Sequence, residues 1–75
     1  MSRAIGTANG TFPRRLRALR KELGLSQYDV ELLSGIPKPR LSRYENGHVG
    51  PSLATVEALA LALEVRPSYL VGWDR

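Results

Sequence analysis

The segment Gly24–Gly47, GLSQYDVELLSGIPKPRLSRYENG, decides how this 75-residue chain is interpreted. Ser26 is a strong helix N-cap, and Asp29 three positions later approximates a capping box with its charge at the positive helix end. A short helix is therefore expected over 27–33. The glycine within the sequence Ser-Gly-Ile at 34–36 permits the positive φ that a sharp turn needs. The segment thus predicts a short helix followed by a tight turn.

A second short helix is expected after this turn, beginning around 37–39 and ending near Glu45, where Asn46-Gly47 closes it. Its apolar residues Ile36, Leu41 and Tyr44 should point to a core. Its basic and small polar residues lie on the face that the apolar ones leave free. A helix-turn-helix sets its second helix into the major groove of DNA with such a face. The pattern predicts a sequence-specific DNA-binding protein.

The order and spacing of many residues across the chain resemble those of one family, the Cro/repressor-type (xenobiotic-response-element, XRE) helix-turn-helix domain of phage and bacterial regulators. The matching residues are Leu16, Leu19, Arg20, Gly24, Leu25, Ser26, Gln27, Val30, Gly35, Ile36, Leu41, Ser42, Arg43, Glu45, Asn46, Gly47, Pro51, Ser52, Leu53, Leu59, Ala60, Leu63 and Leu70. The resemblance implies an all-α fold: a compact, lambda-repressor-like bundle of five helices. It also implies binding to double-stranded operator DNA, usually as a homodimer.

The resemblance further suggests which residues read the bases. By position in the motif, Lys38, Pro39 and Arg43 should face base edges, with Ser42 as a secondary candidate, whereas Arg40 should meet phosphate or solvent. Arginine and lysine can donate to guanine, but proline offers only apolar contact, for instance to a thymine methyl group. Pro39 also disfavours helical dihedrals at Lys38, which leaves Pro39 as an alternative start of the helix. The simpler alternative for this face is a solvated charged helix.

Three further roles are carried over from the family. Gln27 would grip a phosphate at a helix N-terminus, where free N–H groups favour anions, or would simply be exposed there. Asn46 could hold a second phosphate. Arg20 and Glu45 would form an ion pair linking the first helix to the end of the third. Glu31 departs from the family, which usually has alanine there, and its carboxylate must lean outward or pair with a cation.

The remaining helices follow from apolar periodicity. A first helix should start near Pro13 and end at Gly24, with an apolar stripe formed by Phe12, Leu16, Leu19 and Leu23. A fourth should follow Ser52, with a stripe formed by Leu53, Val56, Leu59, Ala60 and Leu63. A short fifth helix should run from Pro67 through Val71 and stop at Gly72. Residues 1–11 are expected to form a flexible arm, and residues 12–75 the helix-turn-helix domain.

Composition narrows the functional classes. Residues 1–43 carry nine Lys/Arg against three Asp/Glu, a net charge of +6, whereas residues 44–75 carry −2. The basic part coincides with the helices expected to meet phosphates. The absence of cysteine suits a reducing cytoplasm, and the chain has neither a long apolar run nor a signal-like N-terminus, so a cytoplasmic protein without a membrane span is expected. No catalytic constellation is present, so we expect neither an enzyme, nor a cofactor, nor a metal site.

The C-terminal residues Tyr69, Val71 and Trp73 are candidates for the dimer interface, because aromatic residues are enriched in interface cores. Trp73 could instead cover its own core. The sequence does not separate a phage repressor, a restriction-modification controller, a free-standing host regulator and an antitoxin with a toxin partner. The alternative from another class is a protein-interaction module that keeps the fold without reading DNA.

Overall fold

The computed structural model describes residues 11–72, and over these residues it contains five α-helices and no strand. The helices are α1 (Thr11–Glu22), α2 (Gln27–Ser34), α3 (Lys38–Glu45), α4 (Leu53–Leu63) and α5 (Pro67–Leu70). The all-α, five-helix fold predicted from the sequence is therefore confirmed. The arm expected over 1–11 lies outside the described residues except for Thr11, which begins α1 two residues before the predicted start.

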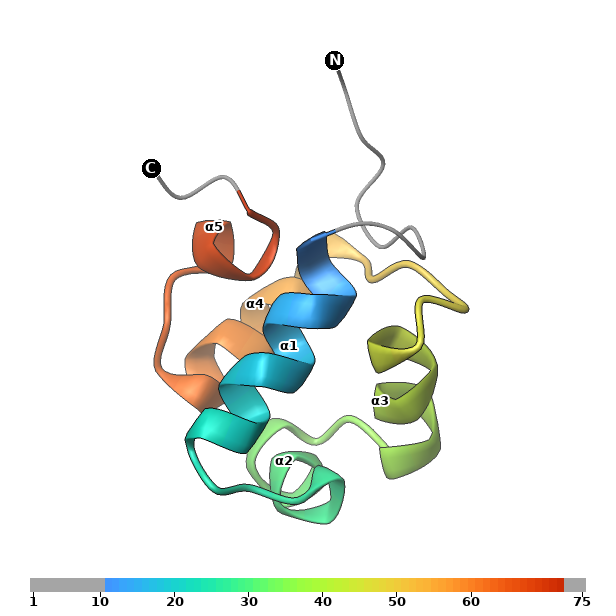
Figure 1. Ribbon diagram of the computed structural model, residues 1–75, viewed down its shortest axis with the longest axis vertical. Coiled ribbons are helices and arrows are strands. Elements are labelled where there is room, and N and C mark those ends of the chain that lie inside the picture. Colours follow the sequence, from blue (N-terminus) through green and yellow to red (C-terminus); the bar gives the residue numbers. More distant parts are fainter. Residues whose placement is uncertain (1–10, 73–75) are drawn as a thin grey trace.

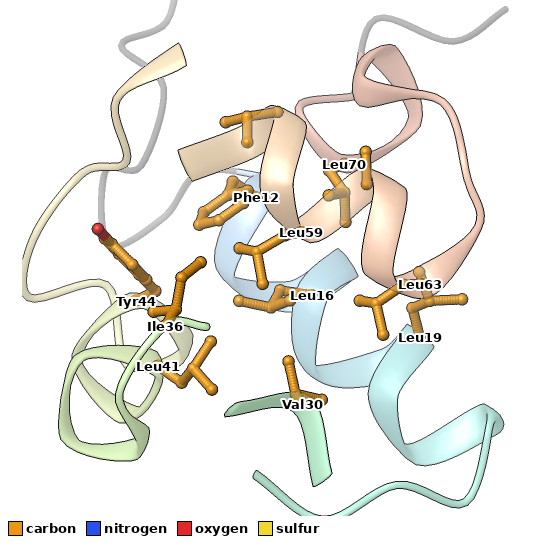
Figure 2. Packing of buried hydrophobic residues seen from close by; sticks show 12 residues of the cluster. Phe12, Leu16, Leu19, Val30, Ile36, Leu41, Tyr44, Leu59, Leu63 and Leu70 are labelled. Carbon is orange, nitrogen blue, oxygen red and sulfur yellow. The ribbon is translucent and has the colours of Figure 1, made fainter. Parts of the chain in front are cut away.

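Helix α1 lies in the middle of the bundle, with α3 on one side and α5 on the other (Figure 1). Helix α4 packs against α2 and α5, and the buried residues of α1 and α4, the two longest helices, belong to one core. The side chains of this core meet between α1, α3 and α4 (Figure 2). Its buried apolar residues are Phe12, Leu16, Leu19, Val30, Ile36, Leu41, Tyr44, Val56, Leu59, Ala60, Leu63 and Leu70. Each such large side chain contributes about 1.5–3 kcal/mol when fully buried.

The ends of α2 have the predicted chemistry. The Asp29 N–H donates to Ser26 Oγ at 3.0 Å, and the Ser26 N–H donates to Asp29 Oδ2 at 2.8 Å, which completes the capping box. Gly35 ends the helix at φ +81°, in the left-handed region, and donates its N–H to the carbonyl of Glu31 at 2.8 Å. This left-handed residue turns the chain from α2 toward α3.

Two residues of the predicted apolar stripes are exposed. Leu23 follows the last residue of α1 and is 48% exposed, although its N–H still donates to the Leu19 carbonyl at 3.0 Å. Leu53 is the first residue of α4 and is 71% exposed, and the buried stripe begins one turn later at Val56. Periodicity therefore identified the helices correctly but extended both stripes one residue too far.

Helix α3 is anchored to the core through its inner face. Tyr44 packs edge to face against Phe12 of α1, with ring centroids 6.0 Å apart and an angle of 79° between the ring planes. Leu41 and Ile36 are also buried, as predicted. This packing leaves the opposite face of α3 at the edge of the molecule (Figure 1).

Candidate nucleic-acid interface

The outer face of α3 carries the residues that the sequence assigned to base reading. Lys38, Pro39 and Arg43 are exposed, and Ser42 is half-buried. Arg40, assigned to phosphate or solvent, is exposed as well. The side chains of Lys38, Arg40 and Arg43 form no ion pair with any residue of 11–72. Three uncompensated cations therefore lie on one eight-residue helix.

Helix α3 begins at Lys38, so the later start considered at Pro39 is wrong. Pro37 precedes it as the N-cap with φ −60° and ψ 143°, and a proline has no side-chain acceptor for the first N–H groups. Glu31 of α2 provides that acceptor: the Lys38 N–H donates to Glu31 Oε1 at 3.0 Å. Neither role considered for Glu31 described this arrangement, because the contact joins residues seven apart across the turn.

Arg20 and Glu45, the pair expected to tie α1 to the end of α3, lie in contact through two hydrogen bonds. Arg20 Nε donates to Glu45 Oε2 at 2.7 Å, and Arg20 Nη2 donates to Glu45 Oε1 at 2.9 Å. The Glu45 side chain is 1% exposed and the Arg20 side chain 13% exposed. Arg20 Nη1 also donates to the carbonyl of Leu25 at 3.0 Å. This fork fixes the orientation of both partners.

Two further side chains donate to Glu45. Gln27 Nε2 lies 3.2 Å and Arg17 Nε 3.5 Å from Glu45 Oε1. Burial by itself would raise the pKa of the Glu45 carboxyl, but the hydrogen bonds from Arg20, Gln27 and Arg17, with the positive charge of Arg20, hold that pKa below its ordinary value. The hydrogen bond to Glu45 correspondingly raises the pKa of Arg20 above its ordinary value, although burial opposes this.

Arg17 is a residue that the sequence interpretation missed. Besides its contact with Glu45, Arg17 Nη2 donates to Asn46 Oδ1 at 3.0 Å, and Asn46 Nδ2 lies 3.4 Å from Ser42 Oγ. Arg17 and Arg20 are three positions apart, so they share a face of α1. That spacing was the available signal. These contacts place Asn46 and Ser42, two candidate DNA contacts, on a chain of polar groups that begins in α1.

Gln27 occupies the N-terminus of α2 and is half-buried, with its amide group on Glu45 rather than in solvent. The Ser26 side chain accepts from the Asp29 N–H, and the backbone N–H groups of Gln27 and Tyr28 have no acceptor within residues 11–72. Free N–H groups at a helix N-terminus favour an anion. The structure thus brings Gln27, Glu45 and Asn46 to one end of α3, while Lys38 and Pro39 lie at its other end.

Comparison with known proteins gives the family. A family model described as Helix-turn-helix (HTH_3) matches residues 16–70, which is most of the chain. The chain belongs to this helix-turn-helix family. It is 36% identical over 62 residues to the immunity repressor protein of Bacillus phage phi105, covering 83% of this chain and 43% of that protein. The chain spans about half the length of the curated relatives that it matches first.

Two solved structures of similar proteins share the helix-turn-helix fold. The restriction-modification controller protein C.AhdI from Aeromonas hydrophila is 38% identical, with a TM-score of 0.77, covering 80% of this chain and 91% of that chain. The P22 c2 repressor protein, solved in complex with a synthetic operator, is 30% identical, also with a TM-score of 0.77, covering 84% of this chain and 96% of that chain. The lambda-repressor-like architecture expected from the sequence is thereby confirmed.

The C-terminal candidates for a dimer interface are only partly described in this helix-turn-helix chain. Tyr69 and Val71 are half-buried, and Trp73 lies outside the described residues. The Tyr69 ring lies under the Arg15 guanidinium, 4.6 Å from ring centroid to Cζ, and Arg15 Nη1 donates to the Tyr69 carbonyl at 3.0 Å. Tyr69 is therefore committed in part to α1 of its own chain.

Between residues 11 and 72, no helix is both long enough and apolar enough to cross a membrane. In that range, no three His, Cys, Asp or Glu side chains are grouped so that they could hold a metal ion.

Proposed function

We propose that this protein is a sequence-specific DNA-binding transcriptional repressor. The proposal rests on the two faces of α3. On the outer face, Lys38 and Arg43 are exposed and form no ion pair with residues 11–72, whereas the inner face packs against the core. A recognition helix needs both properties, because its side chains must reach base edges from a fixed position. Membership of the helix-turn-helix family and the repressor relatives support the same conclusion.

In the proposed complex, α3 enters the major groove. Lys38 and Arg43 donate to acceptors on guanine, Ser42 adds a hydroxyl contact, and Pro39 offers an apolar surface to a thymine methyl group. Phosphates are held by the N-terminus of α2 with Gln27, by Asn46 at the end of α3, and by Arg40. Base contacts then select the sequence, and phosphate contacts fix the register.

The protein is proposed to act as a homodimer on an inverted repeat. One module of this size covers too few base pairs to select a site among millions of competitors. Two recognition helices related by two-fold symmetry would enter successive major grooves about 34–36 Å apart. The protein is proposed to act in the cytoplasm on its DNA and to have no catalytic role.

The test is selection of bound duplexes from a random-sequence library, followed by anisotropy titrations of the enriched site and a scrambled duplex at several salt concentrations. We expect an inverted repeat whose affinity exceeds that of the scrambled duplex by at least about 10³-fold, and a steep loss of affinity with salt. Recovery of no enriched sequence would remove the repressor function. It would favour a protein-interaction module, such as an antitoxin bound to a toxin partner.

A further inference from the structure

The N-terminus of α3 is closed by hydrogen bonds from within the protein. The Lys38 N–H donates to Glu31 Oε1 at 3.0 Å, and the N–H groups of Arg40 and Leu41 each donate to the Pro37 carbonyl at 3.0 Å. Pro39 has no N–H group. All the donors of the first turn of α3 are therefore occupied or absent.

The N-terminus of α2 differs in this respect. Its Ser26 cap satisfies the Asp29 N–H, but the N–H groups of Gln27 and Tyr28 have no acceptor within the described part of the chain. The N-termini of the two helices thus differ toward an approaching anion: α2 offers two free N–H groups, whereas the Lys38 N–H of α3 is already bonded to the Glu31 carboxylate.

We propose that Glu31 is a specificity-determining residue. It fixes the N-terminus of α3 in the position from which its side chains contact bases, and it prevents DNA phosphates from binding to that N-terminus. This inference rests on the proposed DNA-binding function. Recognition helices contact base edges with their N-terminal residues, so Glu31 lies at the end of α3 that would enter the groove. It acts through Lys38 and is a positioning residue rather than a base contact.

The physical reason lies in what a free helix N-terminus would bind. Its N–H groups and dipole attract any phosphate, and every DNA sequence presents the same phosphates. Such a contact would raise affinity for all DNA equally and would compete with insertion of α3 at the correct register. Glu31 satisfies the donor and repels phosphate at the same point. Because Pro37 has no side-chain acceptor, no residue of α3 itself replaces this cap.

The experiment compares Glu31→Ala with wild type on the selected operator and on a scrambled duplex, across a salt series. We expect the ratio of operator to scrambled affinity to fall about tenfold, the size of one lost base-pair preference. The salt dependence on the scrambled duplex should steepen by about one phosphate contact. The matched control is Glu57→Ala, which removes the same charge from the exposed face of α4 and should change neither quantity by a comparable amount.

Glu31→Gln separates the cap from the charge, because its amide oxygen can still accept from Lys38. We expect this variant to retain most of the operator preference. Hydrogen exchange of the Lys38 amide provides a readout without DNA: protection should persist in wild type and Glu31→Gln and be lost in Glu31→Ala.

Equal affinity ratios for Glu31→Ala and Glu57→Ala would overturn the specificity role. If the wild-type protein prefers no sequence, the proposed DNA-binding function is wrong. If the Lys38 amide exchanges at the same rate in Glu31→Ala as in wild type, only the capping of Lys38 by Glu31 is wrong.

Discussion

Arg20 and Glu45 are 25 positions apart, and the Arg20 guanidinium donates hydrogen bonds of 2.7 and 2.9 Å to the Glu45 carboxylate. The pair joins the middle of the bundle to the last residue of the helix proposed to read DNA. Since the carboxylate is almost completely buried, its charge is tolerated only while its donors remain in place. The orientation of α3 thus depends on a polar contact as well as on the packing of Leu41 and Tyr44.

Removing the carboxylate should destabilise the fold strongly. Glu45→Ala leaves Arg20 with a partly desolvated guanidinium and no counter-charge, and we expect a loss of about 3–5 kcal/mol in the free energy of unfolding. Chemical denaturation measures this. Glu57→Ala, an exposed carboxylate on α4, should stay within about 0.5 kcal/mol of wild type. Equal stability of the two variants would contradict a structural role for the pair.

The same pair predicts how stability depends on pH. Folding lowers the pKa of Glu45 below its ordinary value of 4.5, so the unfolded chain binds more protons in this range. The stabilisation is therefore complete above pH 4.5 and is lost as the pH falls through the lower pKa of the folded state. Melting curves of wild type and Glu45→Gln should differ most near neutral pH and converge in acid. A difference that is constant from neutral to acidic pH would show that the charge of Glu45 does not stabilise the fold.

Arg43 and Arg40 should have different effects on DNA binding. Arg43→Ala should cost about 1–3 kcal/mol on the operator and flatten the preference at one base pair, with a smaller loss on scrambled DNA. Arg40→Ala should weaken both duplexes by similar factors, because phosphates are common to all sequences. Anisotropy titrations of both variants on both duplexes decide this. If Arg43→Ala lost affinity equally on both, Arg43 would be a phosphate contact.

The proposed dimer makes a prediction for the C-terminal residues. Trp73→Ala should weaken operator binding by shifting the monomer–dimer equilibrium while leaving the melting temperature of the monomer unchanged. Sedimentation velocity on the free protein and on its operator complex measures this. Leu61→Ala serves as the comparison, because Leu61 is 82% exposed on α4 and has not been assigned to the interface. One copy per operator, with Trp73→Ala identical to wild type, would remove both the dimer and the role of Trp73.

The end of α4 predicts a stabilising substitution. Glu64 caps this helix at φ 60° and is the only non-glycine residue with a positive φ in the described part of the chain. A left-handed conformation costs a residue with a Cβ roughly 1–2 kcal/mol, and glycine escapes most of this cost. Glu64→Gly should therefore raise the free energy of unfolding by about 0.5–1 kcal/mol, after the greater freedom of glycine in the unfolded chain is subtracted. A decrease would mean that the Glu64 side chain stabilises the fold by more than this strain.

Local features of the chain were predictable from the sequence because they depend on neighbouring residues. Ser26 and Asp29 are three positions apart, so their capping box needs only one helical turn to form. Gly35 marks the turn between the two helices of the motif because its positive φ is a property of the residue itself. Apolar periodicity likewise identified the helices and most of the core, including Leu41 and Tyr44 on the inner face of α3.

The family resemblance paired Arg20 with Glu45, but only the tertiary structure decided which other polar groups of different helices meet. Arg17, Gln27 and Glu45 come from three helices, and their convergence depends on the angles at which α1, α2 and α3 pack. The partner of Glu31 could not be predicted from α2, because the N–H group from which Glu31 accepts belongs to Lys38 of the next helix. The sequence by itself determined the helices, the capping box of α2 and the cationic face of α3. Packing determined the hydrogen-bond partners, because a side chain finds its partner through the geometry of the whole bundle rather than through its position in the chain.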